Sequence, residues 1–220
     1  MNLVDITSYQ TLIFDCDGVI LNSNKIKTEA FYEAALVYGK EKANQFVDYH
    51  RENGGISRYK KFQYFFEKII LKNNYNNELY DILNVYSNIV MDKLAKCEIN
   101  PYLHKFKSFT KGARWGVVSG GNQDELRAIF NQRKLSELFE LGIYGSPDTK
   151  EQIFSKIMRN NLYHNPALYF GDSKYDYEVT KIYGVDFLFI SCWTEFSNWR
   201  EFHKKEEFDY ISNFNDLINN

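Results

Sequence analysis

Six short apolar runs, each bounded by turn-forming residues, recur along the chain and constrain its fold more than any other feature. The runs lack the alternation of half-exposed strands, and this pattern is typical of parallel strands that are buried on both faces. Stretches of helical period separate most of them, so the sequence predicts an α/β fold with a doubly wound parallel sheet. The runs are TLIFD (11–15), RWGVVSG (114–120), LFELGIYG (138–145), ALYFGD (167–172), VDFLFIS (185–191) and FDYIS (208–212).

The interval between the first two runs has a different pattern. Between FDCDGVI (14–20) and RWGVVSG lie about ninety residues with several stretches of helical period and no convincing strand. A plain right-handed crossover between parallel strands needs far fewer residues. Helical periods are clearest in 24–39, 57–71 and 77–96, and KNNYNN (72–77) indicates a loop between the last two. The sequence therefore predicts an α/β core domain of residues 1–21 and 97–220, with an all-helical insert domain of residues 22–96.

Composition excludes several classes of function. The 220 residues, 44% hydrophobic and 25% charged, are typical of a globular protein with one sizeable core and a small insert. A net charge of −2 provides no basic field for nucleic acid and no strong attraction to anionic lipid. No apolar run approaches the roughly 18 residues that span a bilayer, and MNLVDITSYQ lacks the pattern of a signal peptide. We therefore expect a cytoplasmic protein with no nucleic-acid or membrane partner.

The three cysteines, Cys16, Cys97 and Cys192, are far apart and form no CxxC motif. Neither a zinc site nor a disulfide framework is indicated, and a reducing compartment fits this usage. Two acids flank Cys16 and would raise the pKa of its thiol, so we expect a small buried hydrophobic residue there rather than a nucleophile.

Reactive residue types gather where the predicted strands end, which is where open α/β sheets bind their ligands. Taken alone, each has a plain structural explanation, such as a solvated turn, a flexible loop, a helix cap or a surface lysine. Their order and their shared placement at one edge of the sheet predict a single site instead. The residues are Asp15 and Asp17 after the first run, Ser119-Gly120-Gly121 at the end of the second, Lys150 at a helix start after the third, and Asp172 and Asp176 in GDSKYD after the fourth.

These residue types share one chemical use. Several carboxylates crowd together only when a cation neutralises them, and oxygen ligands favour Mg²⁺. A carboxylate can attack phosphorus and form an aspartyl-phosphate, while a second carboxylate protonates the leaving oxygen. A hydroxyl, backbone N–H groups at a helix start and a lysine are the donors that phosphoryl oxygens need. The set therefore indicates phosphoryl transfer.

The motifs FDCDGVILNS, VVSGG, the isolated TK before a helix, and GDSKYD resemble the four ordered motifs of the haloacid dehalogenase superfamily. The resemblance implies that Asp15 is the nucleophile and Asp17 the general acid and base. It implies that Ser119 and Lys150 bind the phosphoryl group and stabilise its charge, together with Gly120. The insert resembles the helical cap of phosphoglycolate phosphatases and β-phosphoglucomutases.

The same resemblance implies a magnesium site. Its ligands would be the side chains of Asp15 and Asp172 and the backbone carbonyl of Asp17, with Asp176 supporting the metal or Lys150. Asn22 stands where many relatives have an aspartate, a change that we expect to leave the chemistry intact. An acid at position 17 favours phosphatases and mutases over members that cleave carbon–halogen or carbon–phosphorus bonds.

The turn NGGISRYKKF (53–62) is the most informative part of the insert, because related enzymes carry a similar Gly-x-Ser-Arg turn that dips toward the site. We expect Ser57 to cap the next helix and Arg58 to bind an anionic group of the substrate; the alternative is an ordinary turn with a solvated arginine. Lys27, in the first helical stretch of the insert, is a weaker candidate for this contact, and we expect it at the surface rather than facing the substrate. The aromatic segment 191–202 is expected to pack against the sheet edge rather than to bind a partner.

Three functions remain open. The first is a Mg²⁺-dependent phosphatase that acts on a small phosphorylated metabolite, such as a sugar phosphate. The second is a sugar-phosphate mutase of the β-phosphoglucomutase type, which would use the same residues and a cap arginine for a second phosphate. The third is a catalytically silent interaction protein on the same fold, although no catalytic position of the motifs is lost.

Overall fold

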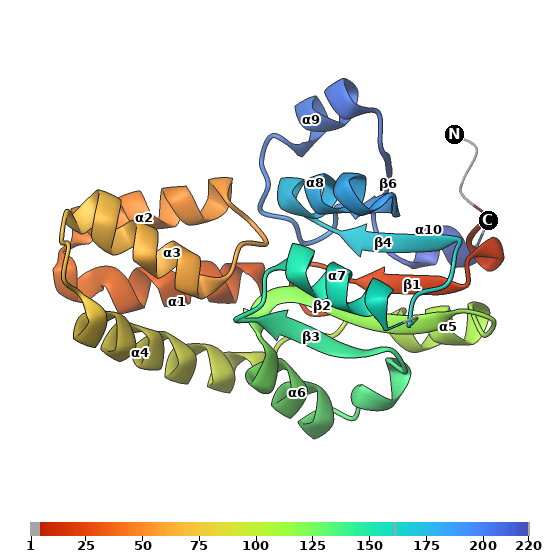
Figure 1. Ribbon diagram of the computed structural model, residues 1–220, viewed down its shortest axis with the longest axis horizontal. Coiled ribbons are helices and arrows are strands. Elements are labelled where there is room, and N and C mark those ends of the chain that lie inside the picture. The colour runs from red at the N-terminus through yellow and green to blue at the C-terminus, as the bar shows by residue number, and fades with distance from the viewer. Residues whose placement is uncertain (1–4, 161, 220) are drawn as a thin grey trace.

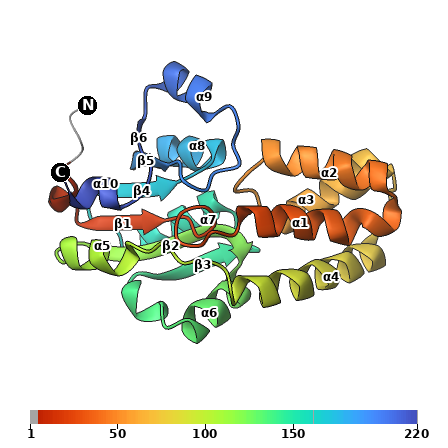
Figure 2. The ribbon, with the colours of Figure 1, turned by 180° about the vertical axis from the view of Figure 1, so that it is seen from behind.

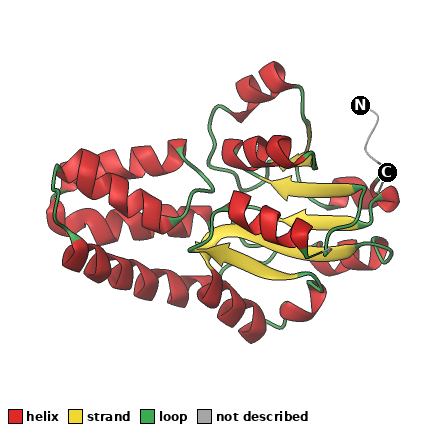
Figure 3. Ribbon diagram, viewed as in Figure 1, coloured by secondary structure: helices red, strands yellow, loops and turns green. Residues whose placement is uncertain are grey.

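Six parallel strands form one sheet within the part of the chain that the structure describes (Figures 1 and 3). The structure is a computed structural model and describes residues 5–160 and 162–219. The strand order is β3-β2-β1-β4-β5-β6, so β1 lies between β2 and β4. Each strand falls within or overlaps one of the six apolar runs. The strands are β1 (Thr11–Phe14), β2 (Arg114–Asn122), β3 (Gly142–Ser146), β4 (Ala167–Gly171), β5 (Asp186–Ile190) and β6 (Asp209–Ile211).

Helices cover both faces of the sheet, because successive strand residues point to opposite sides. Phe14 belongs to a core that includes residues of α5, α6 and α10, whereas Ile13 and Tyr169 belong to a core with residues of α7 and α8. The predicted doubly wound α/β fold is therefore confirmed. These helices are α5 (Leu103–Phe109), α6 (Gln123–Gln132), α7 (Lys150–Arg159), α8 (Lys174–Tyr183) and α10 (Asn215–Ile218).

Aromatic side chains cover the sheet near its β6 edge. Trp199, the first residue of α9 (Trp199–Glu206), is buried and stacks on Phe189 of β5 with 5.1 Å between ring centres. Phe208 belongs to the same cluster. The predicted packing of segment 191–202 against this side of the sheet is confirmed.

Between β1 and β2 the chain forms a group of helices beyond the carboxyl ends of the strands (Figures 1 and 2). Buried aromatic rings hold this insert together; the ring centre of Phe31 lies 5.3 Å from those of Phe46 and Phe62. The predicted helical stretches coincide with α1, α3 with its π-helical continuation, and α4, but none of them covers α2. None of the helices among the described residues is long and apolar enough to cross a membrane. The insert contains α1 (Asn24–Ala35), α2 (Lys40–Glu52), α3 (Arg58–Tyr64), the π-helix (Phe65–Ile70) and α4 (Asn76–Leu94).

The two connections between the insert and the sheet lie side by side. The backbone N–H of Asn22 donates to the carbonyl of Glu98 at 2.9 Å, and Leu21 forms an antiparallel bridge with Ile99. The predicted boundaries fall beside this bridge, and the division into a core domain (1–21 and 97–220) and an insert domain (22–96) stays a prediction.

Candidate active site

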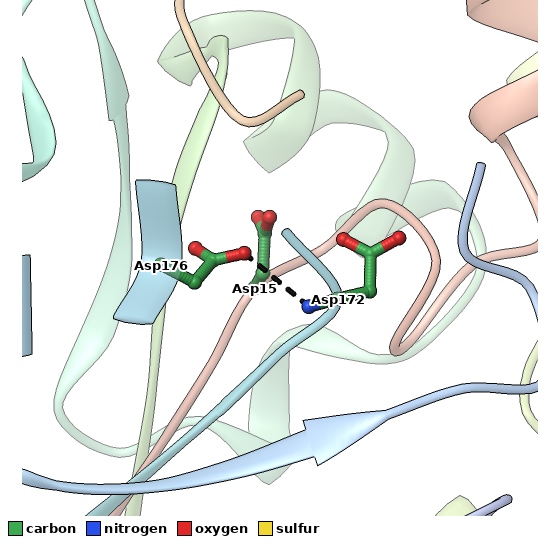
Figure 4. Close-up of side chains that lie close together, drawn as sticks. All are labelled: Asp15, Asp172 and Asp176. Carbon is green, nitrogen blue, oxygen red and sulfur yellow. Dashed lines mark hydrogen bonds between the residues drawn. The ribbon is translucent and has the colours of Figure 1, made fainter. Parts of the chain in front are cut away.

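Three acids meet beyond the carboxyl ends of β1 and β4, which are neighbouring parallel strands (Figure 4). Asp15 follows β1 directly, Asp172 follows β4, and Asp176 lies in the first turn of α8. One carboxylate oxygen of each lies within 4.8 Å of the others, and all three residues are buried. The parallel topology thus brings together acids that are more than 150 residues apart in the sequence.

Lys150 lies against two of these acids. It begins α7, whose capping box at Thr149 fixes the start of the helix. Its Nζ donates to Asp15 Oδ2 at 2.9 Å, to Asp176 Oδ1, and to the hydroxyl of Tyr169 at 3.1 Å. Burial alone would lower the pKa of Lys150, but Asp15 and Asp176 outweigh it and raise that pKa. Lys150 is therefore a permanently charged group beside the predicted nucleophile.

Asp176 is held by donors on both of its carboxylate oxygens. Oδ2 accepts hydrogen bonds from the hydroxyl of Ser173 at 2.6 Å and from its backbone N–H at 3.1 Å, while Oδ1 faces Lys150 and the Tyr169 hydroxyl. This arrangement fits a residue that positions Lys150 and the loop of Asp172. The predicted supporting role of Asp176 stays a prediction.

The donor set fits a divalent cation. Asp172 accepts a hydrogen bond from the neutral amide of Asn24 at 2.6 Å, and no ion pair joins it to a lysine or arginine of the described residues. Burial, with the like charges of Asp15 and Asp176, raises the pKa of Asp172 well above its usual range. Burial also raises the pKa of Asp15 to about 7 although Lys150 opposes the shift. Three buried acids with one lysine leave an excess of negative charge that Mg²⁺ would neutralise.

Asp17 is separate from this cluster and faces the insert. Its Oδ1 accepts a hydrogen bond from the hydroxyl of Ser23 at 2.6 Å, and its Oδ2 forms an ion pair with Lys27 of α1. Burial would raise the pKa of Asp17, but Lys27 and Ser23 outweigh it, and the pKa is lowered. The expectation that Lys27 lies at the surface is wrong, because the loop after β1 returns Asp17 to the first turn of α1 and the lysine is buried there. The predicted use of the Asp17 backbone carbonyl stays a prediction.

Two glycines allow the close approaches that shape the site. Gly18 has a φ of 75°, and a Cβ there would lie 2.1 Å from Asp172 Oδ2, so a larger residue would separate the β1 and β4 loops. At Gly120, a Cβ would lie 2.2 Å from the carbonyl oxygen of Gly55 in the insert. The predicted phosphate-binding loop at the end of β2 is thus in contact with the insert turn 53–56.

Ser119 lies at the base of that loop and is fully buried. Its hydroxyl oxygen accepts a hydrogen bond from the backbone N–H of Gly121 at 3.1 Å, so the hydroxyl proton can be donated to another oxygen. The roles predicted for Ser119, Gly120 and Lys150 in phosphate binding stay predictions.

A cavity of 170 Å³ separates the acids from the insert. Its core side contains the predicted nucleophile, general acid and metal ligand, and its insert side carries five basic side chains and two aromatic rings. These residues are Asp15, Asp17 and Asp172 on the core side, and Lys27, His50, Arg51, Arg58, Lys61, Phe31 and Tyr86 on the insert side.

Arg58 lines this cavity, but a protein carboxylate already binds its guanidinium. Two of its nitrogens donate to the two carboxylate oxygens of Glu125 on α6, one of them at 2.9 Å, and its Cζ lies 4.6 Å from the ring centre of Tyr86. Arg58 is 5% exposed, so the alternative of a solvated arginine is wrong. Its predicted contact with substrate stays a prediction. Ser57 occupies the N-cap position of α3, but its side chain makes no capping hydrogen bond, so that part of the prediction is wrong.

The neighbouring positions 16, 22 and 24 have distinct roles. Cys16 is fully buried, and burial with the charge of Asp17 raises the pKa of its thiol, which confirms its structural role. Asn22 donates to Glu98 at 3.2 Å, outside the acid cluster. Asn24 supplies the amide that reaches Asp172, and it also donates to the carbonyl of Trp193 at 2.9 Å.

Some residues of the site have no signal in the sequence motifs. Tyr169 stands inside an apolar strand, where an aromatic residue normally indicates core packing, yet its hydroxyl contacts both Lys150 and Asp176. Lys61 lies in a predicted helical stretch and His50 lies in none, and no sequence motif distinguishes either residue. The alternation of β4 residues, which places Tyr169 on the same face as α7, was the one available hint.

Comparisons with known proteins agree with this geometry. The sequence model of the haloacid dehalogenase-like hydrolase family matches residues 12–190. A curated relative, a phosphorylated carbohydrates phosphatase of Thermotoga maritima, is 23% identical over 186 residues, which are 80% of this chain and 82% of the relative. The match and this relative confirm the prediction of an enzyme of the phosphatase type.

Solved structures show the same fold. β-Phosphoglucomutase from Clostridium difficile superposes with a TM-score of 0.71 at 16% identity, over 95% of this chain and 93% of its own. CbbY from Rhodobacter sphaeroides, solved in complex with phosphate, superposes with a TM-score of 0.68 at 16% identity, over 95% and 96%. With a family match that covers most of the chain, and with the acids, serine and lysine of the four motifs at one edge of the sheet, the chain belongs to the haloacid dehalogenase-like hydrolases.

Proposed function

We propose that the enzyme is a Mg²⁺-dependent phosphatase that hydrolyses a small phosphorylated carbohydrate or a similar phosphate monoester through an aspartyl-phosphate. The observation that carries the proposal is the position of Asp15, a buried carboxylate 2.9 Å from Lys150, on the floor of a cavity that a second acid, Asp17, also lines. The named activity of the Thermotoga maritima relative supports a carbohydrate substrate.

In the first half of the reaction, a carboxylate oxygen of Asp15 attacks phosphorus and the bond from phosphorus to the leaving oxygen breaks. Asp17 gives a proton to that oxygen, so the product leaves as an alcohol. Lys150, the Ser119 hydroxyl and the backbone N–H of Gly120 donate to the phosphoryl oxygens as charge builds on them. Mg²⁺ bound by Asp15 and Asp172 would supply further neutralisation of phosphoryl charge.

In the second half, Asp17 removes a proton from water, the water oxygen attacks phosphorus, and the bond to Asp15 breaks to release phosphate. Lys27 lowers the pKa of Asp17 and so keeps its carboxylate ionised, which is the form that can accept a proton in this step. Protonation of the leaving group in the first half requires that the ion pair between Lys27 and Asp17 loosen. Movement of α1 relative to the β1 loop would therefore accompany the reaction.

The phosphatase is favoured over the mutase because the curated relative from Thermotoga maritima is named a phosphatase. The proposed partner is a small phosphorylated metabolite. The proposed compartment is the cytoplasm, where cysteines such as Cys16 and Cys97, which are free, stay reduced.

The test is release of inorganic phosphate from p-nitrophenyl phosphate and from a panel of sugar phosphates, with Mg²⁺ and with chelator. We expect metal-dependent release by the wild-type enzyme and none by Asp15→Asn, whose fold is checked by thermal unfolding. Interconversion of sugar monophosphates without net phosphate release would favour the mutase. A folded enzyme with no turnover in either assay would favour the silent protein.

A further inference from the structure

The insert places one lysine beside the cavity without a carboxylate partner. Lys61 of α3 is 2% exposed, and its Nζ lies 2.7 Å from Nδ1 of His50 on α2. The same Nζ lies 5.5 Å from the ring centre of Phe31 on α1. Among the described residues, no aspartate or glutamate forms an ion pair with it. Lys61 and His50 both line the cavity that also contains Asp15.

The two other buried strong bases of the insert that line the cavity are neutralised by the protein, whereas Arg51, which also lines it, is exposed to solvent. Lys27 forms an ion pair with Asp17, and Arg58 forms one with Glu125. The buried positive charge that stays uncompensated on this side of the cavity is therefore that of Lys61. Since Glu125 binds two nitrogens of Arg58, Lys61 is better placed than Arg58 to bind an anion from outside the protein.

The surroundings of Lys61 disfavour its charge when the cavity holds no anion. Burial and the like charge of Lys27 lower the pKa of Lys61 to about 7. Burial and Lys61 itself lower the pKa of His50 well below its usual range, so His50 is neutral. Its Nδ1 can therefore accept a hydrogen bond from the ammonium group, which orients Lys61 but brings no negative charge. An anion in the cavity would compensate a charge that is otherwise costly to bury.

We propose that Lys61, positioned by His50, binds a second anionic group of the substrate, so that the preferred substrate is a phosphate monoester whose leaving alcohol carries a carboxylate or a second phosphate. This inference rests on the proposed phosphatase function. Lys150 on the core side serves the phosphoryl group that is transferred, and Lys61 on the insert side recognises the group that leaves. The side chain of Lys61 is thus a specificity-determining residue.

The test compares kcat/KM for the wild-type enzyme and Lys61→Met on three kinds of ester in the presence of Mg²⁺. Phosphoglycolate represents a leaving alcohol with a carboxylate, a sugar bisphosphate represents one with a second phosphate, and a sugar monophosphate has a neutral leaving group. Lys68→Met is the matched control, because Lys68 is exposed on the π-helix that continues α3. Thermal unfolding checks the fold of each variant, and Lys61→Gln replaces Lys61→Met if the latter does not fold.

We expect the wild-type enzyme to prefer one of the anionic esters by about tenfold or more, and Lys61→Met to lose about tenfold or more on that ester alone. The better of the two anionic esters identifies which group is recognised. Lys68→Met should match the wild type on all three. Equal turnover of anionic and neutral esters by the wild type, or equal losses on all esters in Lys61→Met, would overturn the inference and leave the phosphatase function intact. Absence of turnover of every ester would instead overturn the proposed function.

Discussion

Replacement of Arg58 by methionine tests whether this arginine supports the structure or the substrate. Methionine keeps much of the packing against Tyr86 but removes the guanidinium that binds Glu125. The pair is largely dry, since the side chain of Arg58 is 5% exposed and that of Glu125 is 16% exposed. Arg58→Met therefore leaves a carboxylate at the contact between α3 and α6 without its cation.

The expected loss of stability follows from this burial. Removal of one partner of a buried ion pair costs about 3–5 kcal/mol, because the other charge stays buried alone. The residual exposure of Glu125 and its hydrogen bond from Ser87 place the loss near the lower end, at about 3 kcal/mol. For a protein of this size, each kcal/mol changes Tm by about 2–4 °C, so Arg58→Met should lower Tm by about 6–12 °C.

The assay is thermal unfolding, with the exposed Arg51 replaced by methionine as the matched control. The double variant Arg58→Met/Glu125→Gln should recover most of the loss, because an amide leaves no buried charge. A Tm for Arg58→Met that matches the control would refute the structural role of the pair. Failure of the double variant to recover would show that the loss comes from packing rather than from the unpaired charge of Glu125.

Three further predictions concern the acids. Asp15→Asn should abolish phosphate release without lowering Tm, because the amide cannot attack phosphorus and one of three crowded negative charges is removed; wild-type turnover in this variant would contradict the mechanism. Asp172→Ala should raise the Mg²⁺ concentration needed for half-maximal activity by about tenfold or more, and chelator should abolish wild-type activity, whereas an unchanged Mg²⁺ titration would exclude Asp172 as a ligand. Asp17→Asn should lower kcat by about 10²–10⁴-fold on esters of poorly acidic alcohols, with a smaller loss on p-nitrophenyl phosphate, whose leaving group needs less protonation; equal losses on both would argue against a general acid.

The parallel topology explains why so much of the acid cluster could be predicted from the sequence. A buried strand that ends on an acid places that acid at a known edge of the sheet, and β1 and β4 happen to be neighbours. Lys150 was predictable for the same reason, because it begins the helix after β3. The positions of these side chains depend on backbone direction alone.

The insert side of the cavity was less predictable, because it depends on how helices are rotated. Lys60 and Lys61 are adjacent and equivalent in the sequence, yet the first is exposed and the second is buried against His50. A helical period fixes which residues share a face, but it does not say that a lysine on the inner face faces a cavity. The pair of Arg58 and Glu125 joins positions 67 residues apart and requires the placement of α3 against α6, which no local pattern contains.

The two sides of the cavity carry opposite excess charges. We therefore expect binding of the metal, binding of the substrate and the contribution of the insert to depend on one another. The core side has three buried acids against Lys150, whereas the insert side has Lys61 without an acid. A substrate with a phosphoryl group at one end would add to the negative excess of the core side, so we expect its binding there to need a cation held by the acids. A second anionic group at the other end would meet the positive excess of the insert side. Binding of such a substrate would therefore balance the charges of both sides, and we expect it to couple recognition of the leaving group to exclusion of water from Asp15.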